Sequence, residues 1–437
     1  MDLSIKGMFI FVRNVVVFTQ NMYNPVEVIE LHILDMISAL LGVVMSVYGL
    51  FYVVIALFGM KKRKSDFKKS KPSQRIAAIV AARNEEGVIG QLVESLMKQN
   101  YPRELFDVIV VPNNCTDDTA GAAERAGAKI VNVDTEVHSK GSALKSAFGQ
   151  ILKLDKYDAF AIFDADNIVH PGYFQAANDA LNGGARIAQG YRDSKNPFDN
   201  WVSGGSSIFY WFMNRLFNHG RRVLGKSSHL NGTGFIVAAS LLKETGFDTH
   251  TITEDLEYTA QCLIHGERVY WMDEAITYDE QPESIWYALT QRQRWFGGAW
   301  QCKKYYMKDL LKKRTFSCID LALIFGSIYF MILGSIPIIT SVISMFLYAL
   351  HEPLWALELV LMAALSGVGT ILAMQAFAVL VCLLEKKNAG KMWKGILLFP
   401  LFMALWMLAN WSCILMGPPK WKPIKHKAVE NLPTENM

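Results

Sequence analysis

The clearest pattern in the chain is an uncharged apolar run at 36–60, MISALLGVVMSVYGLFYVVIALFGM. An α-helix rises about 1.5 Å per residue and the apolar core of a bilayer is about 30 Å thick, so this run can cross a membrane. The next segment, 61–74, begins KKRKSDFKKSK and is strongly basic. Because the cytoplasmic flanks of membrane helices are rich in lysine and arginine, we predict a transmembrane helix at 36–60 and a basic cytosolic linker at 61–74.

The segment before this predicted helix, residues 1–35, holds a shorter apolar run, MFIFVRNVVVFT at 8–19, which includes Arg13. We predict an N-terminal interfacial segment here, with a second membrane span as the alternative. The longer run at 36–60 lies too far from the N-terminus for a simple signal peptide, and no small-residue cleavage site follows it.

Residues 75–315 show a different pattern, in which apolar runs of strand length alternate with helix-like segments. RIAAIVAA, DVIVVP, KIVNV and AFAIFDAD fit buried strands, and VIGQLVESLMKQ fits a helix. This alternation predicts an α/β fold with an open parallel sheet, in which ligands bind at the carboxyl ends of the strands. The aromatic-rich segment 196–222 is either a helix that docks this domain under the membrane spans or a buried helix of the domain itself.

Long apolar runs return after Arg314, at 316–350, 354–384 and 395–416. We predict a transmembrane region of three to four spans at 316–417 and a C-terminal tail at 418–437. A cytoplasmic tail requires an even number of crossings and favours four, although four crossings would place the lysines of 386–394 outside.

Composition agrees with a membrane protein and argues against other classes. Of the 437 residues, 51% are hydrophobic, which is high for a soluble enzyme. The net charge of +4 does not suggest nucleic-acid binding. The six cysteines are scattered without a CxxC pair, so neither a zinc site nor a disulfide framework is predicted.

Two aspartates, Asp164 and Asp166, follow the predicted strand AFAIF directly. Both carboxylates can reach one ligand only if the chain turns there, as it does at the carboxyl edge of a sheet. Such oxygen donors suit Mg²⁺ or Mn²⁺ held together with a diphosphate. A solvated acidic loop is the alternative, because DxD is a common sequence.

Glu254 and Asp255 begin the predicted helix ITEDLEYTAQCL, with Thr253 at its N-cap. The helix dipole favours acids in the first turn, so Glu254 and Asp255 can be explained by helix stability alone. The functional alternative is that one of them is the general base for an acceptor hydroxyl. Lys140 and Gly141 precede another predicted helix, where lysine and terminal amides can neutralise phosphate. A surface lysine beside a turn glycine is the simpler alternative.

The segment LTQRQRWFGGAW, residues 289–300, concentrates cations and aromatic rings just before the apolar runs. At helical spacing Gln291, Arg294 and Trp295 share one face. Arg294 can stabilise a leaving diphosphate, and Trp295 can support a sugar ring. An amphipathic helix at the membrane surface is the alternative, and both can hold together. We therefore predict interface helices at 284–315.

With these motifs in this order, the chain resembles the membrane-embedded processive family-2 glycosyltransferases, such as cellulose synthase and hyaluronan synthase. The resemblance extends motif by motif over about residues 75–300, and to the flanking spans by layout only. It implies a cytosolic nucleotide-sugar-binding domain at 75–283, with a GT-A-like mixed sheet, fused to an α-helical transmembrane region.

The resemblance also implies roles for single residues. Asp164 and Asp166 would bind a metal, Asp164 would also contact the nucleotide sugar, and Asp255 would be the general base beside Glu254. Arg294 would act on the diphosphate. The other implied substrate contacts are Gln291, Trp295, Ala82 and Glu85 of VAARNEE, Lys140, and Gly232 and Thr233 of NGTGF.

The sequence departs from this family at two positions. Asn113, in VVPNNCTDDT, stands where the family usually has an aspartate. An amide can still form hydrogen bonds with uracil or ribose, so Asn113 remains a substrate-binding candidate. Ala81 stands where the first motif usually has proline.

The resemblance predicts an inverting hexosyltransferase of the cell membrane, with a cytoplasmic catalytic domain and Mg²⁺ or Mn²⁺ as cofactor. It would polymerise a UDP-sugar, preferably UDP-glucose into a β-glucan, and extrude the polysaccharide through its own channel, with an export or regulatory partner left open. The alternative is a non-processive transferase that adds one sugar to a membrane lipid. A transporter with a nucleotide-binding domain would leave Asp255 and QRQRW unexplained.

Overall fold

The computed structural model describes residues 25–133, 137, 139–351 and 353–417. These residues form two compact units. We call residues 53–326 and 371–417 the sheet unit, and residues 25–52 and 327–370 the helical unit. The predicted interfacial run at 8–19 and the tail at 418–437 lie outside the described residues.

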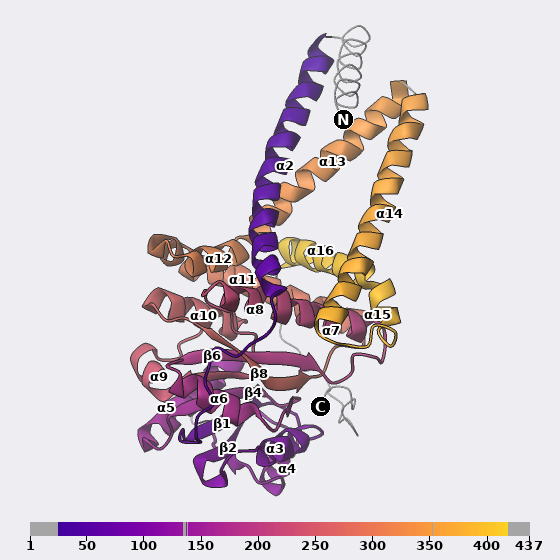
Figure 1. The fold of residues 1–437 in the computed structure, drawn as a ribbon. Coiled ribbons are helices and arrows are strands. Elements are labelled where there is room, and N and C mark those ends of the chain that lie inside the picture. The colour runs from indigo at the N-terminus through magenta and orange to yellow at the C-terminus, as the bar shows by residue number, and fades with distance from the viewer. Residues whose placement is uncertain (1–24, 134–136, 138, 352, 418–437) are drawn as a thin grey trace. The chain divides into compact units, whose positions relative to one another are not determined.

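A mixed sheet of eight strands forms the centre of the sheet unit, in the order β3-β2-β1-β4-β7-β6-β8-β5 (Figure 1). The strands are β1 Ile76–Ala82, β2 Phe106–Pro112, β3 Lys129–Ile130, β4 Ala159–Asp164, β5 Ile168–Val169, β6 Ile187–Ser194, β7 Phe235–Ala238 and β8 Tyr270–Asp279. Strands β3, β2, β1 and β4 are parallel, whereas β7 is antiparallel to both of its neighbours and β5 to β8. The predicted GT-A-like mixed sheet is confirmed, and the all-parallel sheet predicted from the strand–helix alternation holds for these four strands.

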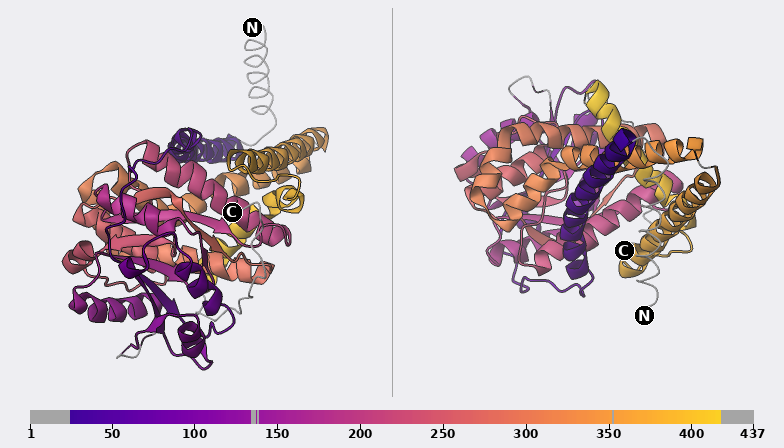
Figure 2. Two further views of the ribbon diagram at one scale, coloured as in Figure 1. Left: turned by 60° about the horizontal axis from the view of Figure 1, so that its bottom comes forward. Right: turned by 90° about the horizontal axis from the view of Figure 1, so that it is seen from above.

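Helices cover both faces of this sheet (Figure 2), which explains why β1 is apolar at every position. Ile76, Ala78 and Val80 enter one core, and Ala77 and Ile79 enter the other. The first core is closed by α3 Ile89–Met97, α4 Thr119–Arg125 and α6 Tyr173–Asn182. The second core is closed by α5 Lys140–Ile151, α9 Ala239–Thr245 and α10 Glu254–His265.

The strand register brings the predicted motifs to one edge of the sheet. Ala81 pairs with Asp164, and Ala82 pairs with Pro112. Strand β7 starts where Phe235 pairs with Ile162, so the NGTG loop before it reaches the same edge. This is the carboxyl edge of β1, β2 and β4, where a ligand is expected.

The aromatic segment 196–222 forms α7 Trp201–Phe212, a π-helical turn Met213–Asn218 and α8 His219–Val223. Its glycines allow close contact with helices from the ends of the chain. Gly204 meets Gly395 of α15 Trp393–Leu397, and Gly205 meets Phe402 of α16 Phe399–Met416. The segment is therefore buried, as one predicted alternative has it, and it packs against the apolar helices α15 and α16. Docking under membrane spans stays a prediction.

The predicted interface region 284–315 is mainly one helix, α11 Ile285–Lys313. It packs against α10 and against α12 Phe316–Phe325. Asp320 of α12 is buried and accepts two hydrogen bonds from Arg221, at 2.6 and 3.1 Å. The start of the apolar run 316–350 is therefore fixed to the sheet unit by an ion pair.

Three helices are long and apolar enough to cross a membrane: Met36–Gly59 within α2 Pro25–Gly59, Leu357–Leu384 within α14 Pro353–Leu384, and α16. The first coincides with the predicted span at 36–60. A fourth exists if α12 and the start of α13 Ser327–His351 form one broken span. In the helical unit, Tyr48 of α2 stacks on Phe330 of α13 with 3.9 Å between ring centroids.

The loop after α14, itself part of the sheet unit, contacts strand β6 directly. Glu385 accepts hydrogen bonds from Tyr191, at 2.5 Å, and from Arg63. Lys387 forms an ion pair of 2.7 Å with Asp193 of β6. These contacts place the loop beside the sheet, whereas the predicted arrangement with four crossings would place it on the opposite side of a membrane.

Candidate active site

Lys140, the first residue of α5, connects three of the predicted motifs. Its ammonium group lies 2.5 Å from Asp164, 2.6 Å from the Gly232 carbonyl oxygen and 3.3 Å from Glu254. Burial disfavours the charged form, but the carboxylates of Asp164 and Glu254 outweigh this and raise the pKa of Lys140. The lysine is therefore a fixed cation between the ends of β4, the NGTG loop and α10.

Asp255 lies next to this cluster, in the first turn of α10. Its Oδ1 accepts a hydrogen bond from the backbone N–H of Leu256 at 2.8 Å, and its Oδ2 lies near Gly232, 3.5 Å from where a Cβ atom would be. Burial and the neighbouring Glu254 raise the pKa of Asp255 to about 7. A carboxylate with such a pKa can accept a proton at neutral pH. Thr253 occupies the N-cap position without a capping hydrogen bond from its side chain.

Arg294 approaches the same acids from α11. Burial lowers the pKa of Arg294, against the opposing charges of Glu254, Asp164 and Asp255. These three carboxylates are the ones around Lys140. The structure thus places the DxD, TED and QxxRW motifs around one site.

The close approach of α10 and α11 depends on Gly298. A Cβ atom at this position would lie 2.3 Å from the Oγ1 and Cγ2 atoms of Thr253, which is itself buried. The glycine of the QRQRWFGGAW segment therefore lets α11, which carries Arg294, pack closely on the start of α10, which carries Glu254 and Asp255.

Gly298→Ala is expected to reduce transfer and to lower the free energy of unfolding by about 1–3 kcal/mol, because the methyl group overpacks the α10–α11 contact. Thermal unfolding in detergent together with turnover would measure both effects. Gly149→Ala is the matched control, since Gly149 lies within α5 with no atom within 4 Å of its added methyl group, and we expect no loss there. Equal behaviour of the two variants would contradict this role for Gly298.

Trp295 belongs to an aromatic cluster. Its ring centroid lies 6.2 Å from Phe209 and 6.0 Å from Tyr210, both of α7, and 5.8 Å from Trp406 of α16. Trp295 is only partly buried, so one part of it stays accessible. Gln291, one turn earlier on α11, is also partly exposed.

Sequence reasoning missed a second layer of polar residues behind Asp164. Arg192 of β6 forms an ion pair with Asp279 of β8, donates a hydrogen bond of 2.8 Å to the Asn231 carbonyl oxygen and lies 4.3 Å above the ring of Tyr210. Asp279 also accepts a hydrogen bond of 3.0 Å from Asn167. No local signal marks Arg192, because its partners come from distant strands and loops.

This layer fixes the positions of the DxD turn and the NGTG loop. The backbone N–H of Asp164 donates to the Thr233 hydroxyl at 3.0 Å and to the Asn167 side chain at 3.2 Å. Thr233 is completely buried, and its hydroxyl also contacts Asn167. Thr233 is therefore positioned to hold the turn rather than to contact a substrate directly.

The predicted nucleoside contacts lie further along the sheet edge. The backbone N–H of Asn113 donates to the Ala82 carbonyl oxygen at 2.9 Å, and the Asn113 side-chain oxygen is buried without a hydrogen-bond partner. Glu85 follows β1, and its backbone N–H donates to the Thr119 hydroxyl at 2.9 Å. The orphaned oxygen of Asn113 is suited to accept a hydrogen bond from a ligand.

Asp164 and Asp166 both lie at the carboxyl end of β4, and Asp166 is 8% exposed. Across the described parts of the chain, no three His, Cys, Asp or Glu side chains are grouped so that they could hold a metal ion. The two carboxylates fit a hard divalent cation only together with further oxygen ligands, such as those of a diphosphate.

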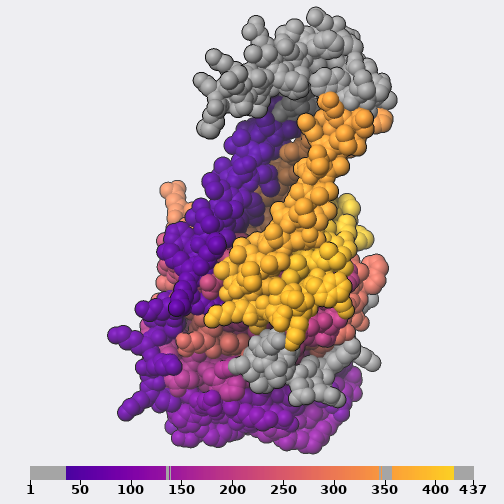
Figure 3. Space-filling view, turned by 45° about the vertical axis from the view of Figure 1, so that its right-hand side comes forward, coloured from indigo at the N-terminus to yellow at the C-terminus, as the bar shows by residue number. Residues whose placement is uncertain are grey.

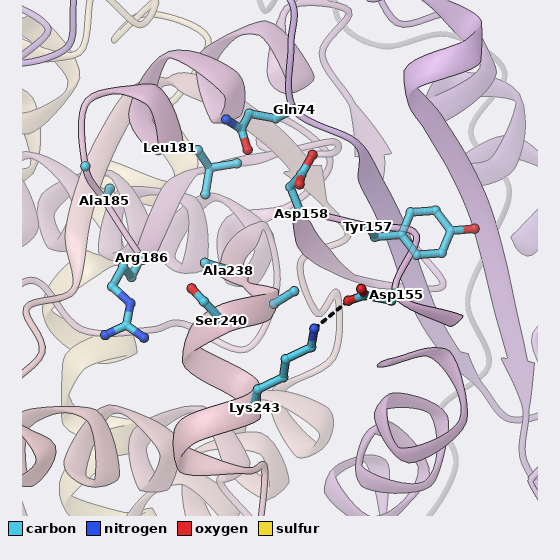
Figure 4. Close-up of a pocket in the computed structure, with 12 residues that line it drawn as sticks. Gln74, Asp155, Tyr157, Asp158, Leu181, Ala185, Arg186, Ala238, Ser240 and Lys243 are labelled. Atoms are coloured by element: carbon cyan, nitrogen blue, oxygen red, sulfur yellow. Dashed lines mark hydrogen bonds and ion pairs between the residues drawn. The ribbon is translucent and has the colours of Figure 1, made fainter. Parts of the chain in front are cut away.

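The structure also has an open pocket of about 520 Å³ at the opposite, amino edge of β1 and β4 (Figure 4). Its cations are already paired: Lys243 lies 2.6 Å from Asp155, and Arg186 lies 2.6 Å from both Glu244 and Glu267. None of the predicted site residues lines this pocket, and we assign it no role.

A family model described as "Glycosyltransferase like family 2" matches residues 72–298, more than half of the chain and the whole region from β1 to the QxxRW motif. The chain belongs to this family. It is therefore a glycosyltransferase, with the GT-A-like sheet described above and apolar helices that could span a membrane.

Curated relatives agree with this family. The chain is 26% identical over 335 residues to the beta-monoglucosyldiacylglycerol synthase of Nostoc, covering 71% of this chain and 67% of that protein. It is 24% identical to "Probable glycosyltransferase YdaM" of Bacillus subtilis, over 66% of this chain and 70% of that protein. The solved mannosyltransferase PcManGT from Pyrobaculum calidifontis has a TM-score of 0.55 at 17% identity and covers 88% of this chain and 99% of its own.

Proposed function

We propose that this family-2 glycosyltransferase transfers a single hexose from a nucleoside diphosphate sugar to a hydroxyl group of a membrane lipid. Relatives from Nostoc and Synechocystis are named as synthases of monoglucosyldiacylglycerol, a lipid that carries one sugar. These names support the lipid-acceptor alternative of the sequence analysis better than polymerisation of UDP-glucose into an extruded β-glucan.

The observation that carries this proposal is the meeting of Lys140, Asp164, Asp255 and Arg294 next to apolar helices. The acids and cations lie at the sheet edge, and Trp295 of the same α11 face contacts Trp406 of α16. A lipid hydroxyl that comes from the membrane side would reach the site along α16. The eight-stranded sheet and the helices that cover it would then lie in the cytoplasm, with the loop after α14 on the same side.

The reaction we propose is a single displacement that inverts the anomeric carbon. Asp255 accepts the proton of the lipid hydroxyl while the hydroxyl oxygen attacks the anomeric carbon. The bond between this carbon and the diphosphate oxygen breaks, and its electron pair stays on the diphosphate. Lys140 and Arg294 hold the departing diphosphate through charge-assisted hydrogen bonds. A divalent metal on Asp164 and Asp166, Mg²⁺ or Mn²⁺, would supply further positive charge to the diphosphate when bound. Ala82, Glu85 and Asn113 would contact the nucleoside, preferably uridine.

The test uses the full chain in nanodiscs with UDP-glucose, Mn²⁺ or Mg²⁺, and 1,2-dioctanoylglycerol. We expect a glucosylated lipid of defined mass, with one nucleoside diphosphate released per lipid. Omission of the lipid should stop transfer and leave only slow hydrolysis. A high-molecular-weight, glycosidase-sensitive product formed without added lipid would overturn the proposal and favour polymerisation.

The pH dependence of kcat/KM should report Asp255. Burial and Glu254 raise its pKa to about 7, and a base works only when deprotonated, so kcat/KM should rise between pH 6 and 8 by about tenfold. Glu254→Gln removes one of the charges that raise this pKa and should move the rise to lower pH. A profile that falls over this range, or that does not move in Glu254→Gln, would contradict the assignment.

A further inference from the structure

Helix α16 covers the QRQRW segment with one face. Its buried residues include Phe402, Ala409 and Cys413, at the spacing of one helix face. The guanidinium group of Arg292 lies 4.1 Å from the ring centroid of Phe402 and 5.3 Å from that of Trp406. Gln293 donates a hydrogen bond of 2.5 Å to Ser412. Arg292, the first arginine of QRQRW, thus contacts α16, whereas the charge of Arg294 acts on the acids of the site.

Two polar atoms at this contact, Nε of Arg292 and Nε1 of Trp406, are buried without a hydrogen-bond partner, and so is Oδ1 of Asn410, one turn further along α16. Arg292 is 1% exposed, and burial lowers its pKa to about 10. Trp406 and Asn410 are four residues apart on α16 and therefore share one side of the helix. Buried polar groups are nearly always hydrogen-bonded. Three unpaired polar atoms on the packed helices α11 and α16 therefore indicate that a further group binds there.

The orphaned atoms lie close to the proposed reaction centre. Trp406 contacts Trp295, with 5.8 Å between their ring centroids, and Trp295 contacts Tyr210 at 6.0 Å. The guanidinium group of Arg192, in the polar layer behind Asp164, lies 4.3 Å from the ring centroid of Tyr210. The rings of Trp406, Trp295 and Tyr210 therefore connect the orphaned atoms with the reaction centre.

We propose that Arg292, Trp406 and Asn410 bind the polar head of the acceptor lipid, and that this head is neutral and carries hydroxyl or ester oxygens. This inference rests on the function proposed above. The site offers two N–H donors and one carbonyl acceptor, which match a hydroxyl group because it both accepts and donates. A phosphate only accepts, and it would be repelled by the oxygen of Asn410. The positive charge of Arg292 is already stabilised by the ring faces of Phe402 and Trp406, so it does not require an anionic ligand.

The face of α16 that points away from Trp406 and Asn410 is apolar and exposed, as expected for contact with lipid acyl chains. Leu401, Leu408 and Leu415 recur every seven residues on one side and are 50%, 61% and 78% exposed. Residues of α16 form part of the yellow surface of the sheet unit in Figure 3. These leucines lie on the other side of α16 from Trp406 and Asn410, so they would pack against surrounding lipid rather than against the chains of the bound acceptor.

The test compares Trp406→Phe and Asn410→Leu with the native full chain in nanodiscs. Each change removes one orphaned polar atom and keeps most of the side-chain volume, so folding should be unchanged or slightly improved. At saturating UDP-glucose, KM for 1,2-dioctanoylglycerol should rise about tenfold, as expected for one lost hydrogen bond, while kcat and KM for the donor stay close to native values. Trp411→Phe, on another side of α16, is the matched control and should change none of these.

A second measurement separates neutral from anionic heads. Dioctanoyl phosphatidic acid should not compete with dioctanoylglycerol, and equal competition would overturn the assignment of a neutral head. Folded variants with an unchanged KM for the lipid would overturn this site while leaving the proposed function intact. A native enzyme that transfers glucose to no lipid but forms a polymer would overturn the proposed function and this site together.

Discussion

Asp255→Asn should lower the rate of glucosyl transfer about a thousandfold while binding of the nucleotide sugar stays close to that of the native enzyme. The amide has nearly the same shape as the carboxylate but cannot accept the proton of the attacking hydroxyl at neutral pH. Oδ1 of Asp255 only caps the backbone N–H of Leu256, an interaction that the side-chain oxygen of asparagine can keep. The fold and the neighbouring Lys140 cluster should therefore remain intact.

The experiment measures transfer from UDP-glucose and, separately, binding of UDP by calorimetry in the same nanodiscs. Asp248→Asn is the matched control, because Asp248 is exposed and its carboxylate pairs with Lys145 rather than with any residue of the candidate site. If Asp255→Asn loses UDP binding in proportion to its activity, the residue acts on the donor rather than as the base. If the variant keeps near-native turnover, another group takes the proton.

The sequence was sufficient for the parts of the site that depend on local pattern. The strand AFAIF predicts that Asp164 comes at a strand end, and the helix-start pattern predicts that Asp255 comes at a helix N-terminus. Once the order of the motifs indicated a family-2 sheet, these ends had to face one edge. The structure places Lys140 and Arg294 there as well.

The rest of the site depends on packing between distant segments, which no local pattern reports. Arg192 lies in the buried strand β6 among other polar residues, and only the pairing of β6 with β8 brings it to Asp279. Hydropathy alone predicts that α16 spans the membrane, yet Phe402 and Trp406 lie against Arg292. The preference for a polymer product followed from the resemblance to processive enzymes, which rested on QxxRW and on the apolar runs after it. These features do not separate a channel from a lipid-binding surface.

Hydropathy also hides the role of Asp320, the single acid in the apolar run at 316–350. Arg221, its partner, is 1% exposed and reaches it from α8, and neither charge has access to water. His229 lies 3.4 Å from the same carboxylate, and burial together with Arg221 lowers the pKa of this histidine, so it adds no charge at pH 7. Arg221 and Asp320 therefore form an ion pair without a third charge, and this ion pair holds α12 against α8.

Asp320→Leu should therefore lower the free energy of unfolding by about 3–5 kcal/mol, because it leaves Arg221 charged and buried without a partner. The double variant Arg221→Met/Asp320→Leu should recover most of this loss, since an apolar pair of similar volume carries no desolvation cost. Thermal unfolding of the full chain in detergent would rank the variants, with Asp309→Asn of the exposed Asp309–Lys312 pair as a control near zero. If the double variant is as unstable as the single one, then α12 is held by the shape of this contact and not by the charges of Arg221 and Asp320.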